Sequence, residues 1–222
     1  LPLREGVGVG VFRRTATLCL VLLLSNNLAR AGEPPFVDGP GSILVEYWRD
    51  LNGNMLADLT GNAEFPDLPT EYQFAKSFEI AADQAENYGT RVRGYLLPPA
   101  SGDYIFWIAS DDAGELWLAD SEDPAKKQKL ASVPEWTGPR EWEKFPSQKS
   151  KAVKLEKGRR YYIEALHKEG AGGDNLAVAW QLPDGTKEQP IPGSRLAPCR
   201  PPKIPPPESL TVSIKLNSRP PA

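Results

Sequence analysis

The sequence predicts an all-β protein, a single antiparallel β-sandwich of jelly-roll type. After the first 31 residues, the chain consists of short runs rich in Val, Ile, Tyr, Phe and Trp, separated by Gly, Pro, Asn and Asp. No stretch of this region shows an apolar stripe of helical period longer than two turns. Many short strands with turn signals between them indicate a sandwich or a barrel, and of the two we expect the sandwich.

The runs with strand character can be placed along the chain. Residues 104–109 are apolar on both alternating faces, as in a buried strand, and the longest irregular stretch is 119–150. Turns at 98–103 and 155–159 are expected to connect paired strands. The expected strands are Ile43–Trp48, Phe74–Ile80, Tyr88–Leu97, Asp103–Ala109, Glu115–Ala119, Lys151–Leu155, Arg160–His167, Leu176–Gln181 and Lys187–Ile191.

The two ends of the chain differ in composition from its centre. Residues 1–31 have a basic start, a short apolar run and a small-residue end at Ala29-Arg-Ala31, which is typical of a secretory signal peptide. We therefore expect a secreted, periplasmic or cell-surface protein. Residues 32–40 form a short linker, 41–198 the sandwich, and 199–222 a proline-rich tail that extends as a semi-rigid spacer.

Charge and composition exclude several classes of function. The chain has 26 Lys and Arg against 29 Asp and Glu, and the excess of acid is larger once the basic residues 1–31 are set apart. Nucleic acids and anionic membranes require clustered Lys and Arg, so neither is an expected partner, and no membrane insertion is expected. Neutral ligands and divalent cations remain compatible. The oligomeric state is not predicted.

The sequence offers no catalytic set, so we expect no enzyme. His167 is the sole histidine, expected at the surface or in a hydrogen bond, and Cys199 is the sole cysteine after residue 31, so neither a nucleophilic triad nor an intrachain disulfide can be assembled. The pattern Asp50-x-Asn52-x-Asn54 with Asp58 suggests a calcium loop, but Gly53 is misplaced for an EF-hand and Gly61 stands where a Glu is required.

The adjacent acids Asp111 and Asp112 are the strongest functional lead. They follow the apolar run 104–109, where a buried strand must emerge at the end of a sheet. Consecutive side chains on a strand point to opposite faces, so the two carboxylates converge on one cation only if the backbone leaves strand geometry. Taken alone, an Asp-Asp-Ala-Gly segment is also typical of a solvated turn.

Several motifs together resemble a known family, the protective-antigen-type PA-fourteen domain. They match its opening strand, central hairpin, most specific motif and closing strands, and they cover residues 41–196. The motifs are Gly41–Trp48, Tyr88–Pro98 with Ser101–Phe106, Ser110–Leu118, Leu155–Ile163 and Leu176–Trp180. The resemblance implies a β-sandwich that is often a carbohydrate-binding module, although not every member binds calcium or sugar.

The resemblance also implies a set of ligands. In lectin members, paired aspartates joined by a cis peptide hold a calcium ion that also takes sugar hydroxyls, which assigns that role to Asp111 and Asp112. An Asn before the closing strand is a further ligand, matched by Asn175, with Asp174 as a possible substitute. Gly173 in the same loop allows close approach of the backbone to a ligand.

Sugar sites commonly add an aromatic ring that covers the apolar face of a pyranose. Trp136 and Trp142, in the stretch 119–150, are the candidates, with a secondary core under this stretch as the alternative. Trp107, Trp117 and Trp180 lie on strands and are expected to be structural. The sequence thus favours a secreted, calcium-dependent carbohydrate-binding module with a targeting or adhesive role. The alternatives are a non-lectin structural or protein-interaction domain, or the accessory module of a larger secreted hydrolase.

Overall fold

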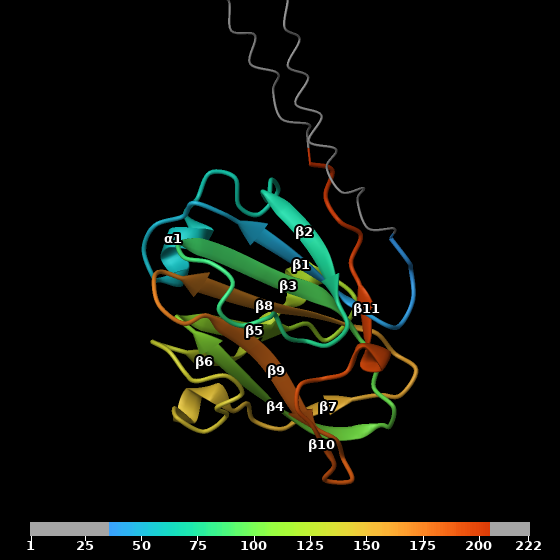
Figure 1. The fold of residues 1–222 in the computed structure, drawn as a ribbon. Coiled ribbons are helices and arrows are strands. Elements are labelled where there is room, and N and C mark those ends of the chain that lie inside the picture. The colour runs from blue at the N-terminus through green and yellow to red at the C-terminus, as the bar shows by residue number, and fades with distance from the viewer. Residues whose placement is uncertain (1–35, 205–222) are drawn as a thin grey trace, which may run out of the picture. The chain divides into compact units, whose positions relative to one another are not determined.

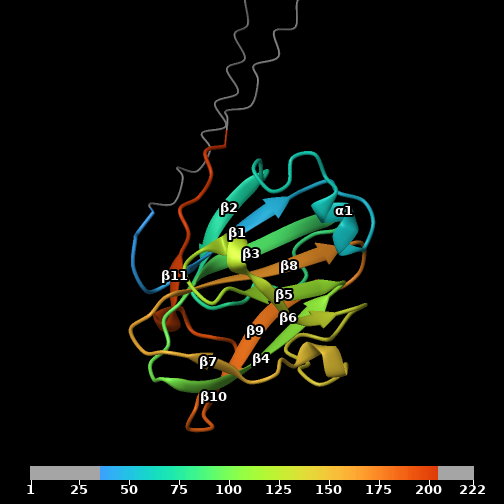
Figure 2. The same cartoon turned by 180° about the vertical axis from the view of Figure 1, so that it is seen from behind.

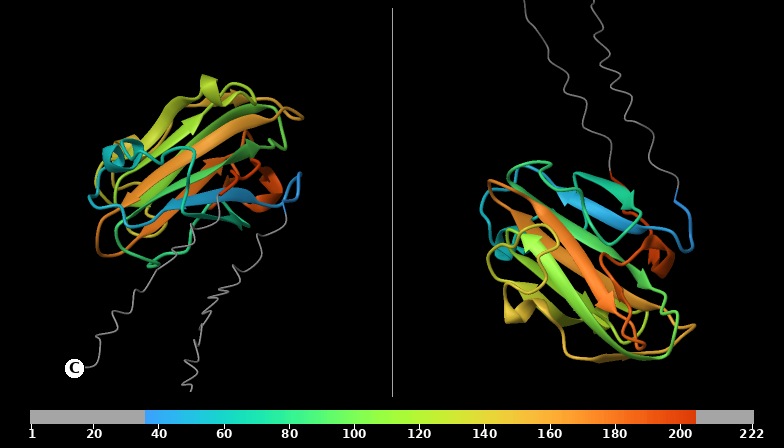
Figure 3. Two further views of the ribbon diagram at one scale, coloured as in Figure 1. Left: turned by 90° about the horizontal axis from the view of Figure 1, so that it is seen from above. Right: turned by 60° about the horizontal axis from the view of Figure 1, so that its bottom comes forward.

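Two antiparallel β-sheets pack face to face in the computed structural model, which describes residues 36–204 (Figure 1). One sheet has seven strands in the order β2-β1-β3-β8-β5-β6, with β11 paired to β3. The other has four strands in the order β10-β9-β4-β7. The predicted all-β antiparallel fold is confirmed, and the two layers can be followed from behind in Figure 2 and from two other directions in Figure 3.

The strand bounds follow the alternation of apolar and polar residues closely in most of the chain. The seven-stranded sheet contains β1 Ile43–Trp48, β2 Glu71–Ala75, β3 Tyr88–Leu96, β5 Gly114–Leu118, β6 Gln128–Val133, β8 Tyr161–Glu169 and β11 Leu196–Pro198. The four-stranded sheet contains β4 Gly102–Asp111, β7 Val153–Leu155, β9 Asn175–Gln181 and β10 Lys187–Glu188.

Helical segments are short and lie between the strands. They are α1 Leu56–Thr60 and the 3₁₀ turns η1 Pro124–Lys126, η2 Pro146–Gln148 and η3 Gly193–Arg195. None of the helices within residues 36–204 has the length and apolar character needed to span a bilayer.

The core lies between the sheets and is made by alternate residues of facing strands. Tyr104, Phe106 and Ile108 point inward from β4 and are fully buried, together with Val178 and Trp180 of β9. They pack against inward residues of β3, β5 and β8 from the other sheet. Burial of this much aliphatic and aromatic surface is the main stabilising contribution, at about 25 cal/mol per Å² of apolar area.

Two predicted turns have a different role from the one expected. The turn 98–103 joins β3 to β4, and the turn 155–159 joins β7 to β8, but neither pair of strands is hydrogen-bonded. β3 already pairs with β1 and β8, and β8 pairs with β3 and β5, so neither strand has a free edge for its neighbour in sequence. Both turns therefore cross between the sheets.

Two further differences concern strand positions. The expected strand Phe74–Ile80 is split, because β2 ends at Ala75 and the following residues bond to the other sheet, where Ile80 N donates to Leu176 O at 3.0 Å. The stretch 119–150, expected to be irregular, contains β6, which pairs with β5. Its sequence is polar at the start because one side of this edge strand is exposed.

The predicted signal peptide, residues 1–31, lies outside the described residues, as do residues 205–222 of the predicted proline-rich tail. Both remain predictions. Cys199 is a buried free thiol.

Candidate functional site

Four strand ends from both sheets meet at one end of the sandwich. β4 ends there and β5 begins, and β8 ends and β9 begins, so that two loops leave the sheets side by side. The carboxylates gathered here are Asp83, Asp111, Asp112, Glu169 and Asp174, and we refer to these five residues as the acidic tip. The sequence prediction included three of them and missed Asp83 and Glu169.

The peptide bond between Asp111 and Asp112 is cis, as the family resemblance implies. Asp111 is the last residue of β4, where it stands opposite Asn175 of β9 and forms an isolated bridge with Trp136 on its other side. One carboxylate oxygen of Asp112 accepts a hydrogen bond from Gly170 N at 3.0 Å. The backbone thus leaves strand geometry between Asp111 and Asp112, which is the condition that the sequence sets for the two carboxylates to converge.

Asn175 contributes an acceptor that the protein leaves unused. The residue is 4% exposed, and its Nδ2 donates to Thr137 O at 2.8 Å. This bond fixes the amide so that Oδ1 is the free atom, and Oδ1 has no hydrogen-bond partner among the described residues. A buried amide oxygen without a hydrogen-bond partner destabilises the folded protein. It is therefore free to coordinate an ion or to accept a hydrogen bond from a ligand.

Asp174 has a mainly structural task. Its Oδ2 accepts hydrogen bonds from Gln84 N at 2.7 Å and Ala85 N at 3.0 Å. These bonds hold the loop before β3 against the loop before β9. The other oxygen, Asp174 Oδ1, has no partner among the described residues, so both residues that the sequence offered for one ligand position keep a free oxygen.

Gly173 lies where two carboxylates approach the backbone. A Cβ built on this glycine would lie 3.4 Å from Asp83 Oδ1 and 3.6 Å from Asp111 Oδ2. Asp83 has a positive φ of 54°, which turns its loop toward the tip. Nothing in the sequence near Asp83 indicates this approach, because it depends on the packing of two loops far apart in the chain.

Glu169 is the most deeply buried acid of the tip. It is completely buried, and neither carboxylate oxygen has a hydrogen-bond partner among the described residues. Burial, followed by the charges of Asp112 and Asp111, raises its pKa to about 8. Burial and the charge of Asp112 likewise raise the pKa of Asp111 to about 6. The tip therefore holds carboxyl groups whose ionised forms are disfavoured by burial and by one another.

Basic groups near the tip oppose these shifts only in part, since the charge of Lys144 lowers the pKa of Asp111 but does not offset burial and Asp112. Lys168 is buried and its Nζ donates to the backbone oxygens of Gly53 and Glu169, while burial lowers its pKa. His167 is fully buried, which corrects the expected surface position, and its hydrogen-bonded role is found at Nε2, 2.6 Å from Asp111 O. Burial lowers the pKa of His167 to about 4, so the ring is neutral and donates to that carbonyl.

The carboxylate, amide and backbone oxygens of the tip are of the kinds that coordinate a hard metal cation. No three Asp, Glu, His or Cys side chains within residues 36–204 are grouped so as to hold a metal by themselves. An ion would therefore need the carboxylates of Asp111 and Asp112, the free Oδ1 of Asn175 and backbone carbonyls. Calcium accepts such a set, because it takes six to eight oxygens of several kinds in a flexible geometry.

The two candidate aromatic residues are separated in the structure. Trp136 lies at the tip, bridged to Asp111, and is 50% exposed. The ammonium of Lys144 lies 2.8 Å from the centroid of its ring. Trp142 is not part of the tip but lines a pocket with Trp107. The structure therefore brings only Trp136 to the paired acids.

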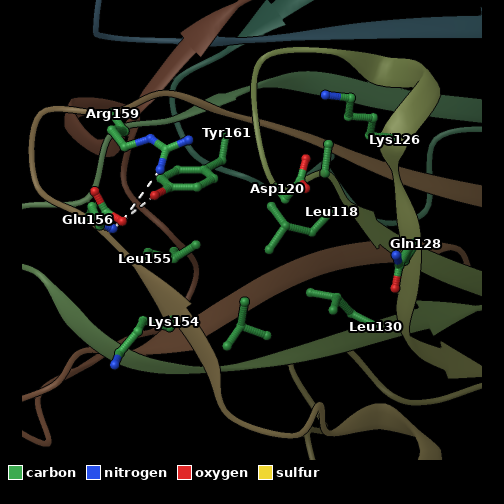
Figure 4. A pocket seen from close by; sticks show the side chains of 12 residues that line it. Leu118, Asp120, Lys126, Gln128, Leu130, Lys154, Leu155, Glu156, Arg159 and Tyr161 are labelled. Carbon is green, nitrogen blue, oxygen red and sulfur yellow. Dashed lines mark hydrogen bonds and ion pairs between the residues drawn. The ribbon is translucent and has the colours of Figure 1, made fainter.

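A pocket of about 470 Å³ lies at the opposite end of the sandwich, where β5 ends and β8 begins (Figure 4). Leu118, Leu130 and Leu155 are apolar residues of its lining, and Glu156 and Arg159 pair at 3.4 Å beside it. No residue that lines this pocket has a buried side-chain polar atom without a partner. In this respect the pocket differs from the tip, where buried oxygens have no partner.

The fold and the tip together define a β-sandwich module with a cluster of carboxylate and amide oxygens at one end. The PA14 domain family model matches residues 38–194, so the chain belongs to the PA14 domain family. The family assignment made from the sequence motifs is thereby confirmed.

Similar proteins are much longer or share only the fold. A mouse N-acetyl-beta-glucosaminyl-glycoprotein 4-beta-N-acetylgalactosaminyltransferase 1 is 36% identical over 160 residues, which cover 70% of this chain and 15% of the relative. Dog fibrocystin is 27% identical over 138 residues, 58% of this chain and 3% of fibrocystin. The chain thus spans a small part of these relatives.

Among solved structures, the PA14 sugar-binding domain of an RTX adhesin has a TM-score of 0.53 and 13% identity, covering 72% of this chain and 98% of that one. The PA14 domain of the MpAFP antifreeze protein has a TM-score of 0.52 and 13% identity, covering 75% of this chain and 95% of that one. At these identities the likeness is one of fold.

Proposed function

We propose that this chain is a carbohydrate-binding module that recognises sugars through a calcium ion held at the acidic tip. The observation that carries the proposal is the meeting of Asp111 and Asp112 with the unpartnered Oδ1 of Asn175. Acids and a free amide oxygen at the mouth of two loops form a cation site, whereas a solvated turn would need neither the burial nor the free oxygen.

The residues of the tip divide into three tasks. Asp111, Asp112 and Asn175 would hold the ion, and Asp174 fixes the loop before β3 through Gln84 and Ala85. A calcium ion bound there would offer its open coordination positions to sugar hydroxyls. Gly173 keeps the approach open, since it presents no side chain between the carboxylates.

Trp136 would supply the apolar contact. Its ring is half exposed beside Asp111, and one face is occupied by the ammonium of Lys144. A pyranose would stack on the other face through its apolar C–H side. The contact would orient the sugar relative to the ion and add apolar burial to an otherwise polar site.

The identity of the relatives suggests where such a module works. The transferase with 36% identity acts, by its name, on glycoproteins that carry N-acetyl-β-glucosamine. We propose as a second possibility that this module presents glycoprotein glycans to a larger protein of which it is part. The module itself would be non-catalytic in either case. Residues 1–31 support a further proposal, that it acts outside the cell or at its surface.

Binding to a printed array of defined glycans, with millimolar calcium and with a chelator, tests the proposed function. We expect a restricted set of glycans to be bound with calcium and lost with the chelator. Asp112→Asn should give the chelator pattern in the presence of calcium, and Glu156→Gln, at the opposite end of the sandwich, should bind as the unchanged protein does. An unchanged array pattern after chelation would refute calcium-dependent recognition.

A further inference from the structure

A second pocket, of about 480 Å³, lies on the outer face of the four-stranded sheet. It is lined by Trp107, Glu141, Trp142, Glu143, Lys144, Lys187 and Gln189. Its volume falls within the range of about 300–1,000 Å³ typical of small-molecule sites. The lining combines two indole rings with amide, ammonium and carboxylate groups, which can donate to and accept from hydroxyls.

Trp107 gives this pocket a free hydrogen-bond donor. The residue is 2% exposed, and its Nε1 has no partner among the described residues. Trp107 lines the pocket, and its N–H is a buried donor that no group of the described residues satisfies. The ammonium groups of Lys149 and Lys187 lie 5.2 and 5.0 Å from its ring centroid, so the ring is held by two cations.

The pocket and the acidic tip share one face of one sheet. Trp107 and Asp111 are four residues apart on β4 and project to the same side, since alternate residues of a strand share a face. At about 3.3 Å per residue, they are about 13 Å apart. Between them Ala109 and Ala177 stand opposite each other and are buried beneath the side chains that cross this face.

Polar groups continue across this interval. Glu79 lies beside β9 opposite Ala177, and Arg140 lies beyond the other edge of β4; the two form a pair with both bonds at 2.8 Å. The pair therefore crosses the face between the tip and the pocket, and the Arg140 side chain is 53% exposed. Lys144 lines the pocket and donates to Trp136 O at 3.0 Å, which joins the pocket to the tip directly.

We propose that the Trp107–Trp142 pocket is a second sugar subsite, so that the module binds an oligosaccharide that reaches from the acidic tip to this pocket. This inference rests on the proposed function and extends it from a single sugar to about three linked residues, given the 13 Å spacing. The distal residue would stack on Trp142 and accept a hydrogen bond from Trp107 Nε1. Gln189 and the carboxylates of Glu141 and Glu143 would bind its remaining hydroxyls.

The charges of the pocket favour a neutral sugar over an ionic ligand. Two lysines and two glutamates line it, so neither sign predominates. Both signs can bond to hydroxyl groups, which donate and accept, whereas a carboxylate or sulfate ligand would meet repulsion from Glu141 and Glu143.

The test compares Trp142→Ala with a matched control, Trp117→Ala. Trp117 also lies between two lysines, with Lys127 and Lys129 5.8 and 5.9 Å from its ring, but on the other sheet. Each variant and the unchanged protein are applied with calcium to a printed array of defined glycans from monosaccharides to decasaccharides. Trisaccharides and larger glycans on the array that bind are then titrated by calorimetry beside their terminal monosaccharides.

We expect Trp142→Ala to bind the oligosaccharides about tenfold more weakly, a loss of about 1.4 kcal/mol, and so to lower their affinity relative to the monosaccharides. Trp142→Phe should restore part of the loss, and Trp117→Ala should match the unchanged protein. Equal oligosaccharide affinities for Trp142→Ala and Trp117→Ala, with calcium-dependent binding intact, would overturn the subsite and leave the proposed function standing. Absence of any bound glycan for the unchanged protein would refute both. Thermal melting of each variant verifies that it is folded.

Discussion

Loops connect the strands at both ends of the sandwich, but the two ends differ in how their polar groups are hydrogen-bonded. At the end shown in Figure 4, the turn after β7 is closed by its own groups: Glu156 N donates to Tyr161 Oη at 2.9 Å, and Lys157 N donates to Ser101 Oγ at 2.9 Å. At the acidic tip, Asn175 Oδ1 and both oxygens of Glu169 have no partner among the described residues.

The difference teaches which end is adapted to stability and which to binding. Buried polar groups in folded proteins are nearly always hydrogen-bonded, because an unpaired one costs roughly 1–3 kcal/mol. An end that satisfies its groups gains stability without a ligand. An end that leaves acids buried and unpaired gains it when a cation arrives, which is the signature of a binding site.

The largest expected effect comes from removing the paired acids. Asp111→Asn combined with Asp112→Asn should weaken calcium binding by at least about 100-fold, because two charged ligands are replaced by neutral ones. Isothermal calorimetry with calcium chloride measures this. The matched pair Asp120→Asn and Glu156→Gln, at the opposite end, should keep the original affinity. Similar losses in both double variants would mean that calcium binds without reference to the tip.

Adding a side chain at Gly170, beside Asp112, should have the next largest effect on calcium affinity. A Cβ at position 170 would lie 3.1 Å from Asn54 Cβ and 3.2 Å from Asp112 Oδ2, closer than ordinary contacts. Gly170→Ala should therefore displace the Asp112 carboxylate and lower calcium affinity about tenfold, a loss of about 1.4 kcal/mol. In Gly138→Ala the added Cβ meets only the Glu141 side chain, at 3.6 Å, so its calorimetric titration should be unchanged. Unaltered affinity in Gly170→Ala would show that Asp112 does not hold the ion.

Replacing Glu169 should show how much its buried carboxylate destabilises the folded protein in the absence of a cation. Its pKa is raised from 4.5 to about 8, so the stability that depends on its neutral form is complete below about pH 4.5 and is lost as the pH rises to about 8. In a chelator, Glu169→Gln should melt higher than the unchanged protein by a few degrees, on the order of 5 °C, at pH 8. The difference should vanish near pH 4.5.

Thermal melts at the two pH values, each in chelator, measure this effect. Glu156→Gln serves as the control, because Glu156 lies at the satisfied end and should show no such dependence on pH. If Glu169→Gln melts no higher than the unchanged protein at pH 8, the tip does not store the repulsion described here.

The smallest expected signal is the absence of a titration. His167 is the sole histidine of the chain, and burial lowers its pKa from 6.5 to about 4. Its neutral form contributes stability that is complete above about pH 6.5 and is lost as the pH falls through about 4. Its imidazole proton resonances should stay constant from pH 8 to pH 5 in NMR spectra. A midpoint near 6.5 would place the ring in solvent and contradict its contact with Asp111 O.

Much of the fold could be predicted because it is written in local patterns. The sequence predicts β1 at its observed bounds, and β3, β4, β5, β8 and β9 within about two residues, since apolar alternation and Gly or Pro punctuation act within single strands. β6 was missed because an edge strand with one exposed side carries few apolar residues. The pairing of strands was misjudged at 98–103 and 155–159, because it depends on which edges remain free.

The candidate site divides in the same way. Asp111 and Asp112 could be found in the sequence, because adjacent acids after a buried strand are unusual wherever they occur. Asp83 and Glu169 could not, since each reaches the tip only through the packing of loops and strands remote in the chain. Trp142 is an aromatic residue of the type that stacks on sugars, but it lines the pocket with Trp107 and not the acidic tip.

The sequence by itself determined the all-β class, the family and the pair of acids at a strand end, because periodicity and motif are properties of neighbouring residues. Tertiary structure alone decided which strand ends meet, which oxygen of Asn175 stays free and how the outer face joins the tip to a second pocket. Those outcomes depend on contacts between distant segments, where burial and hydrogen bonding are settled for the whole fold at once.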